Sequence, residues 1–218
     1  MRTACFAVAA FLLAAGLPVL AAGKAEAVPA RASMSYLEGE VTVDTKAAAI
    51  GDLVALGATV KTAAQSLCEI VFNAKNLIRM SENTTLVFNP ANLQSGSELQ
   101  QGSLALVLKG LSAGSGGTGF IVRTRNAVAG VRGTSFFMKV EDSKTTYVCC
   151  CNGAIHLDDG AGAAVRDIEA SHHKAVRFTR SGGAVTVAEA QLLFHTDADM
   201  EAVAAKVGAT INWSAIDR

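Results

Sequence analysis

Short segments in which apolar residues alternate with polar or small ones recur between Ser35 and Phe178. Glycine, asparagine, aspartate and serine separate these segments at short intervals. Successive side chains of a β-strand point to opposite faces, so a period of two is typical of strands with one buried face. The pattern therefore predicts a mainly β fold, a sandwich, barrel or roll, and argues against a βαβ fold. The alternation is clearest in residues 39–43, 68–72, 104–108 and 120–124.

The pattern becomes helical beyond Gly183, and we expect a C-terminal helical extension over residues 184–218. A first short helix is predicted over Val187–Phe194. Thr196 with the acids that follow it is typical of a helix N-cap and first turn, and Gly208 is typical of a helix end. Apolar residues between these two positions have the spacing of one helix face: Met200, Val203, Ala204 and Val207.

The first 21 residues predict an export signal. A positive charge at Arg2 precedes an uncharged apolar run over residues 4–15, and small residues lead to a cleavage position after Ala21, with a second one after Ala27. No later apolar run reaches the length of about 20 residues that spans a bilayer. We therefore expect a periplasmic or secreted protein with no membrane span once the signal is removed.

The charge balance bears on the class of partner. Nineteen lysines and arginines balance nineteen aspartates and glutamates. Proteins that bind nucleic acid concentrate positive charge against the phosphate backbone, and binding to an anionic membrane surface needs a similar excess. We expect no nucleic-acid partner.

A series of motifs carries a resemblance to a known family. The most specific is Ala-Gly-Val-Arg-Gly-Thr at residues 129–134, which follows Phe120-x-Val122-x-Thr124. The elements before these, in order, are Gly39-x-Val41-x-Val43, Ile50-Gly51-Asp52-Leu53-Val54, Gly57-x-x-Val60-x-Thr62, Ser66 with Ile70 and Phe72, Ile78-x-Met80, Thr84-x-Leu86, and Leu99-x-x-Gly102-x-Leu104. This order resembles the FecR-type domain over roughly residues 34–178.

The resemblance implies one β-rich extracytoplasmic domain, a β-sandwich or β-roll, and it brings no catalytic residues. In the best-known members such a domain senses a surface receptor and regulates a sigma factor. Only an export signal precedes the domain here, so we expect no direct contact with a sigma factor. The prediction is a non-enzymatic module that binds an envelope protein or a small ligand.

Two glycines flank Arg132 within the most specific motif. Glycine allows conformations that other residues avoid, and a guanidinium offers five fixed donors. Gly130, Arg132 and Gly133 therefore predict a structural turn, at which Arg132 holds neighbouring carbonyls or a carboxylate.

Three consecutive cysteines, Cys149, Cys150 and Cys151, lie in a segment that reads as a β-strand interrupted near Asn152-Gly153. On a strand, Cys149 and Cys151 project from one face and Cys150 from the other. A reversal near Ala161 would place the following segment beside this strand. Its register sets Cys149 opposite His173, and a shift of one residue sets Cys151 opposite His172 instead.

Sulfur and imidazole ligands from neighbouring strands suit tetrahedral zinc or a related soft metal. The sequence thus predicts a metal, haem or redox site, with zinc, iron or haem as the candidates. The ligands would be Cys149, Cys151 and His172 or His173, with His195 as a further candidate. His156 reads as a residue of the solvent-facing side of the strand.

Two other readings of the cysteines stay open. In an oxidising compartment Cys68, which has the parity of a core residue, could form a disulfide with Cys150. Alternatively the cysteines are small buried apolar residues. A thiol-disulfide enzyme is the weakest reading, because reactive thiols usually lie at a helix N-terminus beside a cation, whereas these lie within a strand.

Overall fold

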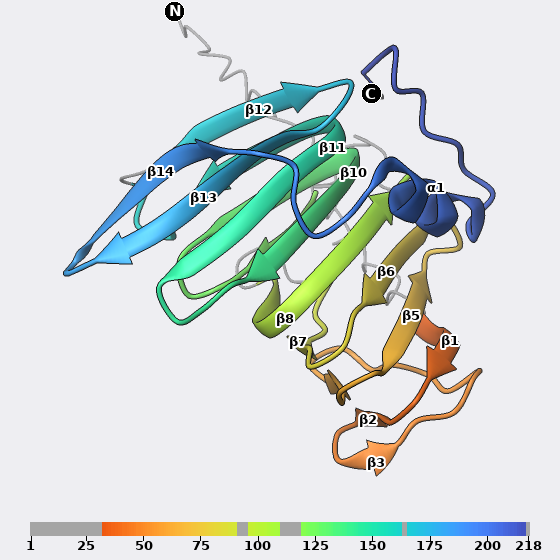
Figure 1. Cartoon of the computed structure of the whole chain (residues 1–218). Coiled ribbons are helices and arrows are strands. Elements are labelled where there is room, and N and C mark those ends of the chain that lie inside the picture. Colours follow the sequence, from red (N-terminus) through yellow and green to blue (C-terminus); the bar gives the residue numbers. More distant parts are fainter. Residues whose placement is uncertain (1–31, 91–95, 110–118, 163–164, 217–218) are drawn as a thin grey trace, which may run out of the picture.

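The computed structural model describes residues 32–90, 96–109, 119–162 and 165–216. Within them the chain is mainly β, with one α-helix near the C-terminus, which confirms the predicted fold class (Figure 1). Among these residues, no helix has the length and apolar character that crossing a bilayer requires. The export signal predicted for residues 1–21 lies outside the described residues.

The N-terminal half of the sheet consists of seven short strands that meet at the long strand β8. Strand β1 pairs with β5, β5 with β6, and β4 lies between β2 and β7. The first part of β8 pairs with β7 and its second part with β6, so β8 joins the two groups. The bounds are β1 Ala32–Glu38, β2 Val41–Val43, β3 Lys46–Ala47, β4 Thr59–Thr62, β5 Leu67–Phe72, β6 Asn76–Met80, β7 Thr85–Val87 and β8 Ser97–Leu108.

The C-terminal half continues from β8 through the long strands β10 and β11. Strand β10 pairs with β11 along most of its length, and on its other side with β9 and then β8. Strand β11 pairs in turn with β12 and with β13, and β14 pairs with β13 at the edge. The bounds are β9 Phe120–Arg123, β10 Val128–Val140, β11 Thr145–Asp158, β12 Arg166–Ala170, β13 Lys174–Ser181 and β14 Ala184–Ala190.

Alternation along these strands separates two apolar clusters, which we call the inner core and the outer core. The inner core lies on one face of the central strands and takes most of the large side chains. The outer core lies on the opposite face, between the sheet and the helix. Central residues of the inner core are Leu104, Leu106, Leu108, Phe136, Met138, Val148, Cys150 and Cys68. The outer core consists of Leu77, Ala105, Val107, Phe137, Tyr147, Cys149, Cys151, Ala175, Met200, Val203 and Ala204.

Helix α1, Asp197–Ala205, covers the outer core (Figure 1). Thr196 caps it as predicted, because its side chain accepts from the Asp199 amide while the Asp199 carboxylate accepts from the Thr196 amide. The buried residues of α1 are Met200, Val203 and Ala204, on the predicted face. Gly208, just beyond the helix, has a left-handed φ of 65°.

The short helix predicted over Val187–Phe194 is wrong. Residues 184–190 form strand β14, which pairs with β13 from Ala175↔Ala190 to Ser181↔Ala184. Val185 and Val187 alternate with exposed residues and pack against the inner core, so the period is two. A short apolar run fits both periods, and pairing with the free edge of β13 decided between them.

The predicted turn at Gly130, Arg132 and Gly133 is also wrong, because these residues lie inside β10. Gly130 and Arg132 pair with His156 and Ala154 of β11. The register shifts just after Arg132, and Gly133 has a left-handed φ of 55°, so the glycine forms a β-bulge without reversing the chain. β11 likewise continues through Asn152-Gly153.

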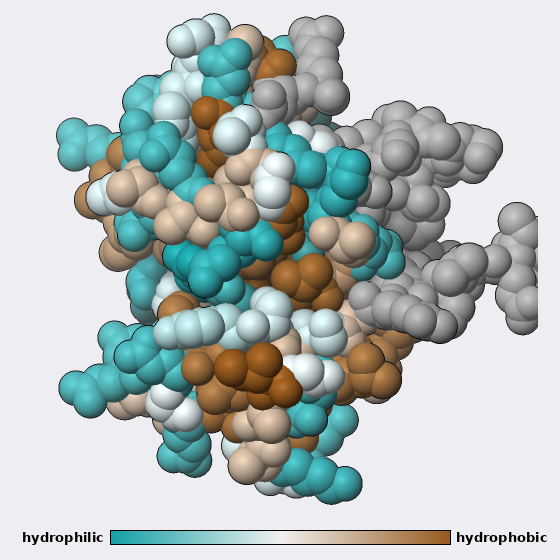
Figure 2. Space-filling view, turned by 90° about the vertical axis from the view of Figure 1, so that its right-hand side faces the viewer, coloured by the Kyte–Doolittle hydropathy of each residue, from teal (hydrophilic) through white to brown (hydrophobic). Residues whose placement is uncertain are grey.

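The face of the molecule turned to the right in Figure 1 carries apolar surface among polar side chains (Figure 2). Exposed large apolar side chains of the described residues fall in two segments and at one isolated position. One segment follows β3 and the other joins β14 to α1. They are Ile50, Leu53 and Leu56, then Leu192, Leu193 and Phe194, with Val165 separate from both.

Candidate metal centre

Strand β11 projects two cysteines from its outer face. Cys149 and Cys151 belong to the outer core, whereas Cys150 between them belongs to the inner core with Cys68, as the alternation predicts. All four side chains are fully buried, and none of the four forms a disulfide. The two outer thiols thus lie side by side on a face that is closed to water.

His173 reaches the first of these thiols from the link between β12 and β13. Its Nδ1 lies 3.5 Å from Cys149 Sγ, and its amide donates to the Cys151 carbonyl. Strand β11 pairs with β13 through Cys149↔Ala175, so the predicted pairing of Cys149 with His173 was displaced by two residues. His173 has a φ of 25°, an unusual value for a residue with a side chain, and it sits where the chain passes from β12 to β13.

His195 reaches the second thiol from the segment between β14 and α1. Its Nε2 lies 3.3 Å from Cys151 Sγ. Its ring stacks on Phe137 of β10, with 4.4 Å between centroids and 15° between planes. The stacking and the contact with Cys151 together fix the orientation of the ring. The sequence predicted His195 only as a further candidate ligand.

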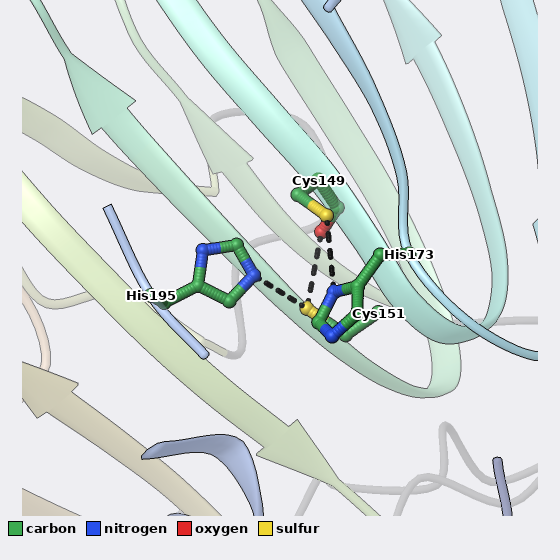
Figure 3. Close-up of side chains that lie close together, drawn as sticks. All are labelled: Cys149, Cys151, His173 and His195. Atoms are coloured by element: carbon green, nitrogen blue, oxygen red, sulfur yellow. Dashed lines mark hydrogen bonds between the residues drawn. The ribbon is translucent and has the colours of Figure 1, made fainter. Parts of the chain in front are cut away.

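The four side chains converge on one point (Figure 3). One ligand atom from each of Cys149, Cys151, His173 and His195 lies within 4.8 Å of all the others. A tetrahedral ion with bonds of about 2.0–2.3 Å holds its ligand atoms about 3.3–3.8 Å apart. The two sulfur–nitrogen distances given above already have this length, so small rotamer changes would close the site around an ion.

Each histidine holds its other ring nitrogen against an oxygen that can only accept. His173 Nε2 lies 2.8 Å from Asp197 Oδ1, and His195 Nδ1 lies 2.9 Å from the Leu193 carbonyl. A carbonyl or carboxylate there requires a proton on that nitrogen, and in the neutral ring this leaves the lone pair on the nitrogen that faces sulfur. Metal-binding histidines in proteins are oriented by such contacts.

His172 and His156 lie outside this cluster. The ring of His172 is exposed, and its Nε2 lies 3.0 Å from Asp197 Oδ2, so it shares the carboxylate with His173 without reaching a thiol. His156 faces solvent on β11, as predicted, and its Nδ1 lies 2.7 Å from Asp167 Oδ1. Of the predicted pair of histidines, only His173 reaches the thiols.

The electrostatics of the two outer thiols differ. Hydrogen bonding with Cys151, and then with His173 and His195, holds the pKa of Cys149 well below its usual range, although burial opposes this. Burial and the neighbouring Cys149 raise the pKa of Cys151. The pKa values of the two thiols are thus shifted in opposite directions, as is common where two titratable groups share a site.

The pKa values of His173 and Asp197, which adjoin these thiols, are also shifted. Burial lowers the pKa of His173, but its contacts with Cys149 and Asp197 outweigh burial and raise it overall. Burial raises the pKa of Asp197, but the hydrogen bonds from His172 and His173 lower it overall. The Asp197 carboxylate thus supports the ring that faces Cys149.

Cys149, His173 and Asp197 are also arranged in the order of a catalytic cysteine, its base and the group that orients the base. A nucleophile must reach its substrate, but the Cys149 side chain is 0% exposed. Trp213 stacks on His173, with 5.0 Å between the ring centroids. The arrangement therefore suits a bound ion better than attack on a substrate.

Sequence reasoning missed three residues that shape this site. Asp197 had been read only as an acid in the first turn of a helix. Trp213 lies in the predicted C-terminal extension, where no role at this site was assigned to it, and it stacks on His173. Asn152 was assigned to a strand interruption, but its side-chain amide donates to carbonyls of Ser171, Asn212 and Ala215. Local sequence holds no signal for these contacts, because they join segments up to 63 residues apart.

Comparison with known proteins identifies the domain. The family model described as FecR protein matches residues 58–156. Two crystal structures of "a putative anti-sigma factor from Parabacteroides distasonis ATCC 8503", at 1.65 Å and 2.50 Å resolution, are each 17% identical over 60% of this chain, with a TM-score of 0.47. The chain spans 59% of the length of those structures. No curated protein matches the sequence.

These findings correct one prediction. We had expected no direct contact with a sigma factor, and that exclusion is wrong. The match over residues 58–156 is to FecR, the family for which the resemblance above implies regulation of a sigma factor. The exclusion had rested on what precedes the domain, and the point at which this sequence begins supports no such conclusion.

Proposed function

Because the chain carries a FecR domain over residues 58–156, we propose that it is a non-enzymatic binding module of the cell envelope whose ligand is a metal ion. Cys149, Cys151, His173 and His195 are the ligands. Two of them belong to the matched domain and two to the segments that follow it.

The single observation that carries this proposal is the orientation of the two histidines. Each directs one nitrogen at a buried sulfur, at 3.5 Å for His173 and 3.3 Å for His195, and each anchors the other nitrogen on an oxygen. A cluster formed only by packing has no need of anchored nitrogens. Four soft or borderline ligand atoms that share one point, with their outer contacts satisfied, form the pattern of a metal site.

The ligand set favours zinc among the candidate cofactors. Two sulfurs and two imidazole nitrogens make up a tetrahedral zinc shell, and thiolate also suits other soft ions such as copper(I). A haem takes one or two axial protein ligands and needs a flat slot for its ring. Four ligand atoms within 4.8 Å of one another surround a single ion and leave no space for a macrocycle between them.

The location in the envelope rests on two supports. FecR proteins are associated with the envelope, and the first 21 residues have the composition of an export signal. N-terminal sequencing of the mature protein tests the second support, with a start at residue 22 or 28 as the expected result. A mature chain that begins at Met1 would contradict it.

Cobalt(II) titration tests the metal site, because cobalt takes the place of zinc and absorbs strongly when bound to thiolate. We expect one cobalt per chain, with a thiolate charge-transfer band and a tetrahedral ligand-field spectrum that added zinc abolishes. The Cys149→Ser/Cys151→Ser variant should show neither feature.

The matched control is Cys150→Ser on the same strand, which removes a thiol from the opposite face. It should bind cobalt as the wild-type protein does. The proposal is refuted if the wild-type cobalt spectrum lacks a thiolate band. It is also refuted if the double variant binds cobalt as tightly as wild-type protein does.

A further inference from the structure

The site joins two parts of the chain. Cys149 and Cys151 come from β11 in the middle of the sheet, whereas His195 comes from the segment that follows β14. Asp197, which orients His173, is the first residue of α1. An ion held by all four ligands therefore bridges the sheet and the C-terminal segment, which we define as residues 191–216.

We infer that metal binding fastens the C-terminal segment onto the outer face of the sheet, and that the segment opens more readily when the metal is absent. The inference rests on the proposed metal site, and it assigns that site a regulatory role.

Apolar packing alone gives the C-terminal segment a modest hold on the sheet. Helix α1 has nine residues, and an isolated helix of that length is not stable in water. It buries three side chains, Met200, Val203 and Ala204. Leu192, Leu193 and Phe194, which lead into it, stay substantially exposed, at 42%, 37% and 51%. Val207, Ala209, Ile211 and Trp213 also pack against the outer core but are only partly buried. Apolar packing of the segment is therefore incomplete, and specific contacts add to it.

Those specific contacts gather around the metal ligands. Trp213 stacks on His173, and its indole nitrogen donates to Glu201 of α1 over 2.7 Å. Asn152 directly follows Cys151, and its side-chain amide nitrogen Nδ2 donates to the carbonyls of Asn212 and Ala215 over 2.9 Å each. The end of the segment is thus attached to the same point of β11 as the beginning, where His195 contacts Cys151.

The C-terminal segment covers a surface that would otherwise meet solvent. Under it lie Leu77, Val107, Phe137 and Tyr147 of the outer core, all fully or almost fully buried. The Tyr147 hydroxyl accepts from the Leu193 amide and donates to the Gln191 carbonyl. Release of the segment would expose this apolar face of the FecR domain, so metal occupancy controls which surface the domain presents.

Hydrogen exchange of the full-length reduced protein, with and without zinc, tests this inference. An ion that binds only the closed form, at 100 times its Kd, lowers the open fraction by about 100-fold. We expect amides of α1 to exchange up to about 100-fold more slowly with zinc. Amides of β8 around Leu106 exchange by global unfolding, so they report the effect of zinc on global stability separately. Amides of β3, at the opposite edge of the sheet, open by local fraying and provide the reference that zinc should leave unchanged.

The His195→Ala variant separates fastening from binding. It removes the ligand that belongs to the C-terminal segment and keeps three on the sheet side, so zinc should no longer slow exchange in α1. His172→Ala, which removes a neighbouring ring that does not reach the thiols, is the matched control and should retain the zinc effect.

The outcomes distinguish the two proposals. If wild-type protein gives the cobalt spectrum but zinc leaves exchange in α1 unchanged, the fastening inference is overturned and the metal site stands. If no cobalt or zinc binds, both fall together. The comparison of wild-type protein with and without zinc needs no variant, so it does not depend on the folding of His195→Ala.

Discussion

The two faces of β11 carry the same residue type in opposite surroundings. On the inner face, Cys150 shares an apolar core with Cys68, and burial raises the pKa of each thiol to about 12. On the outer face, Cys149 and Cys151 are just as deeply buried, but two imidazoles face them. Hydrogen bonding with Cys151, and then with these two imidazoles, lowers the pKa of Cys149 despite its burial.

The difference shows that burial alone does not determine what a cysteine does. An apolar environment keeps the inner thiols protonated, and they behave as small apolar side chains. The outer thiols have nitrogen neighbours held by Asp197 and the Leu193 carbonyl, so the same burial creates a dry ligand set. Function on this strand thus depends on what the adjoining segments place opposite each face.

The largest expected contrast is in how zinc affects stability. At 1,000 times its Kd, an ion that binds only the folded state adds about 4 kcal/mol to the free energy of unfolding. Wild-type protein should gain this amount in urea denaturation, and Cys149→Ala/Cys151→Ala should gain nothing. Cys68→Ala/Cys150→Ala should lose stability without zinc, yet keep the full zinc increment. Equal zinc increments in both double variants would erase the distinction between the faces.

The next contrast separates the two cores. Leu106 is fully buried in the inner core, so Leu106→Ala should lower the free energy of global unfolding by about 2–5 kcal/mol. Val203→Ala removes two methyl groups from the outer core, worth about 1.6 kcal/mol at about 0.8 kcal/mol each. Urea denaturation measures the first, and hydrogen exchange in α1 the second. A Val203→Ala variant that destabilises the whole sheet as much as Leu106→Ala does would show that the cores are not separable.

A smaller effect is expected at the carboxylate that orients His173. Asp197→Asn removes the charge that supports the ring, and the loss of such an outer contact typically lowers metal affinity by about 10- to 100-fold. Competition with a zinc chelator of known affinity measures the change. Asp167→Asn is the matched control, because Asp167 pairs with His156 on the solvent face and should leave zinc affinity unchanged.

The smallest effect concerns pH and the inner face. Burial raises the pKa of the Cys68 thiol in the folded protein to about 12, whereas the same thiol in the unfolded chain has its ordinary pKa of 9.0. This group's contribution to stability is therefore complete below pH 9 and is lost progressively as the pH rises toward 12. Between pH 8 and 10, wild-type protein should lose on the order of 1 kcal/mol more than Cys68→Ala. Urea denaturation under reducing conditions measures the stability of both proteins at each pH. If both lose stability equally between pH 8 and 10, the buried environment assigned to Cys68 is contradicted.

Much of the fold follows from local patterns in the sequence. The period of two placed Cys149 and Cys151 on one face, and the Thr196 cap located α1, because both signals act between near neighbours. Strand β14 was missed because Val185 and Val187 alternate over too short a run to exclude a helix. What decided its conformation was the free edge of β13.

The site was harder to predict because its geometry depends on register and on distant segments. A two-residue error in the length of the β11–β13 connection changed which residue lies opposite Cys149. His195 and Asp197 reach the site only because the C-terminal segment crosses the outer face of the sheet. The sequence therefore indicated the ligand types and one strand, but it could not specify the complete set.

X-ray absorption at the zinc edge of the zinc-loaded protein tests the central claim most directly. The account predicts two sulfur ligands at about 2.3 Å and two nitrogen ligands at about 2.0–2.1 Å, with the multiple scattering of imidazole. The sulfur shell should disappear in Cys149→Ser/Cys151→Ser and persist in Cys150→Ser. A shell of oxygen and nitrogen without sulfur would contradict the assignment of this buried cluster as the metal site.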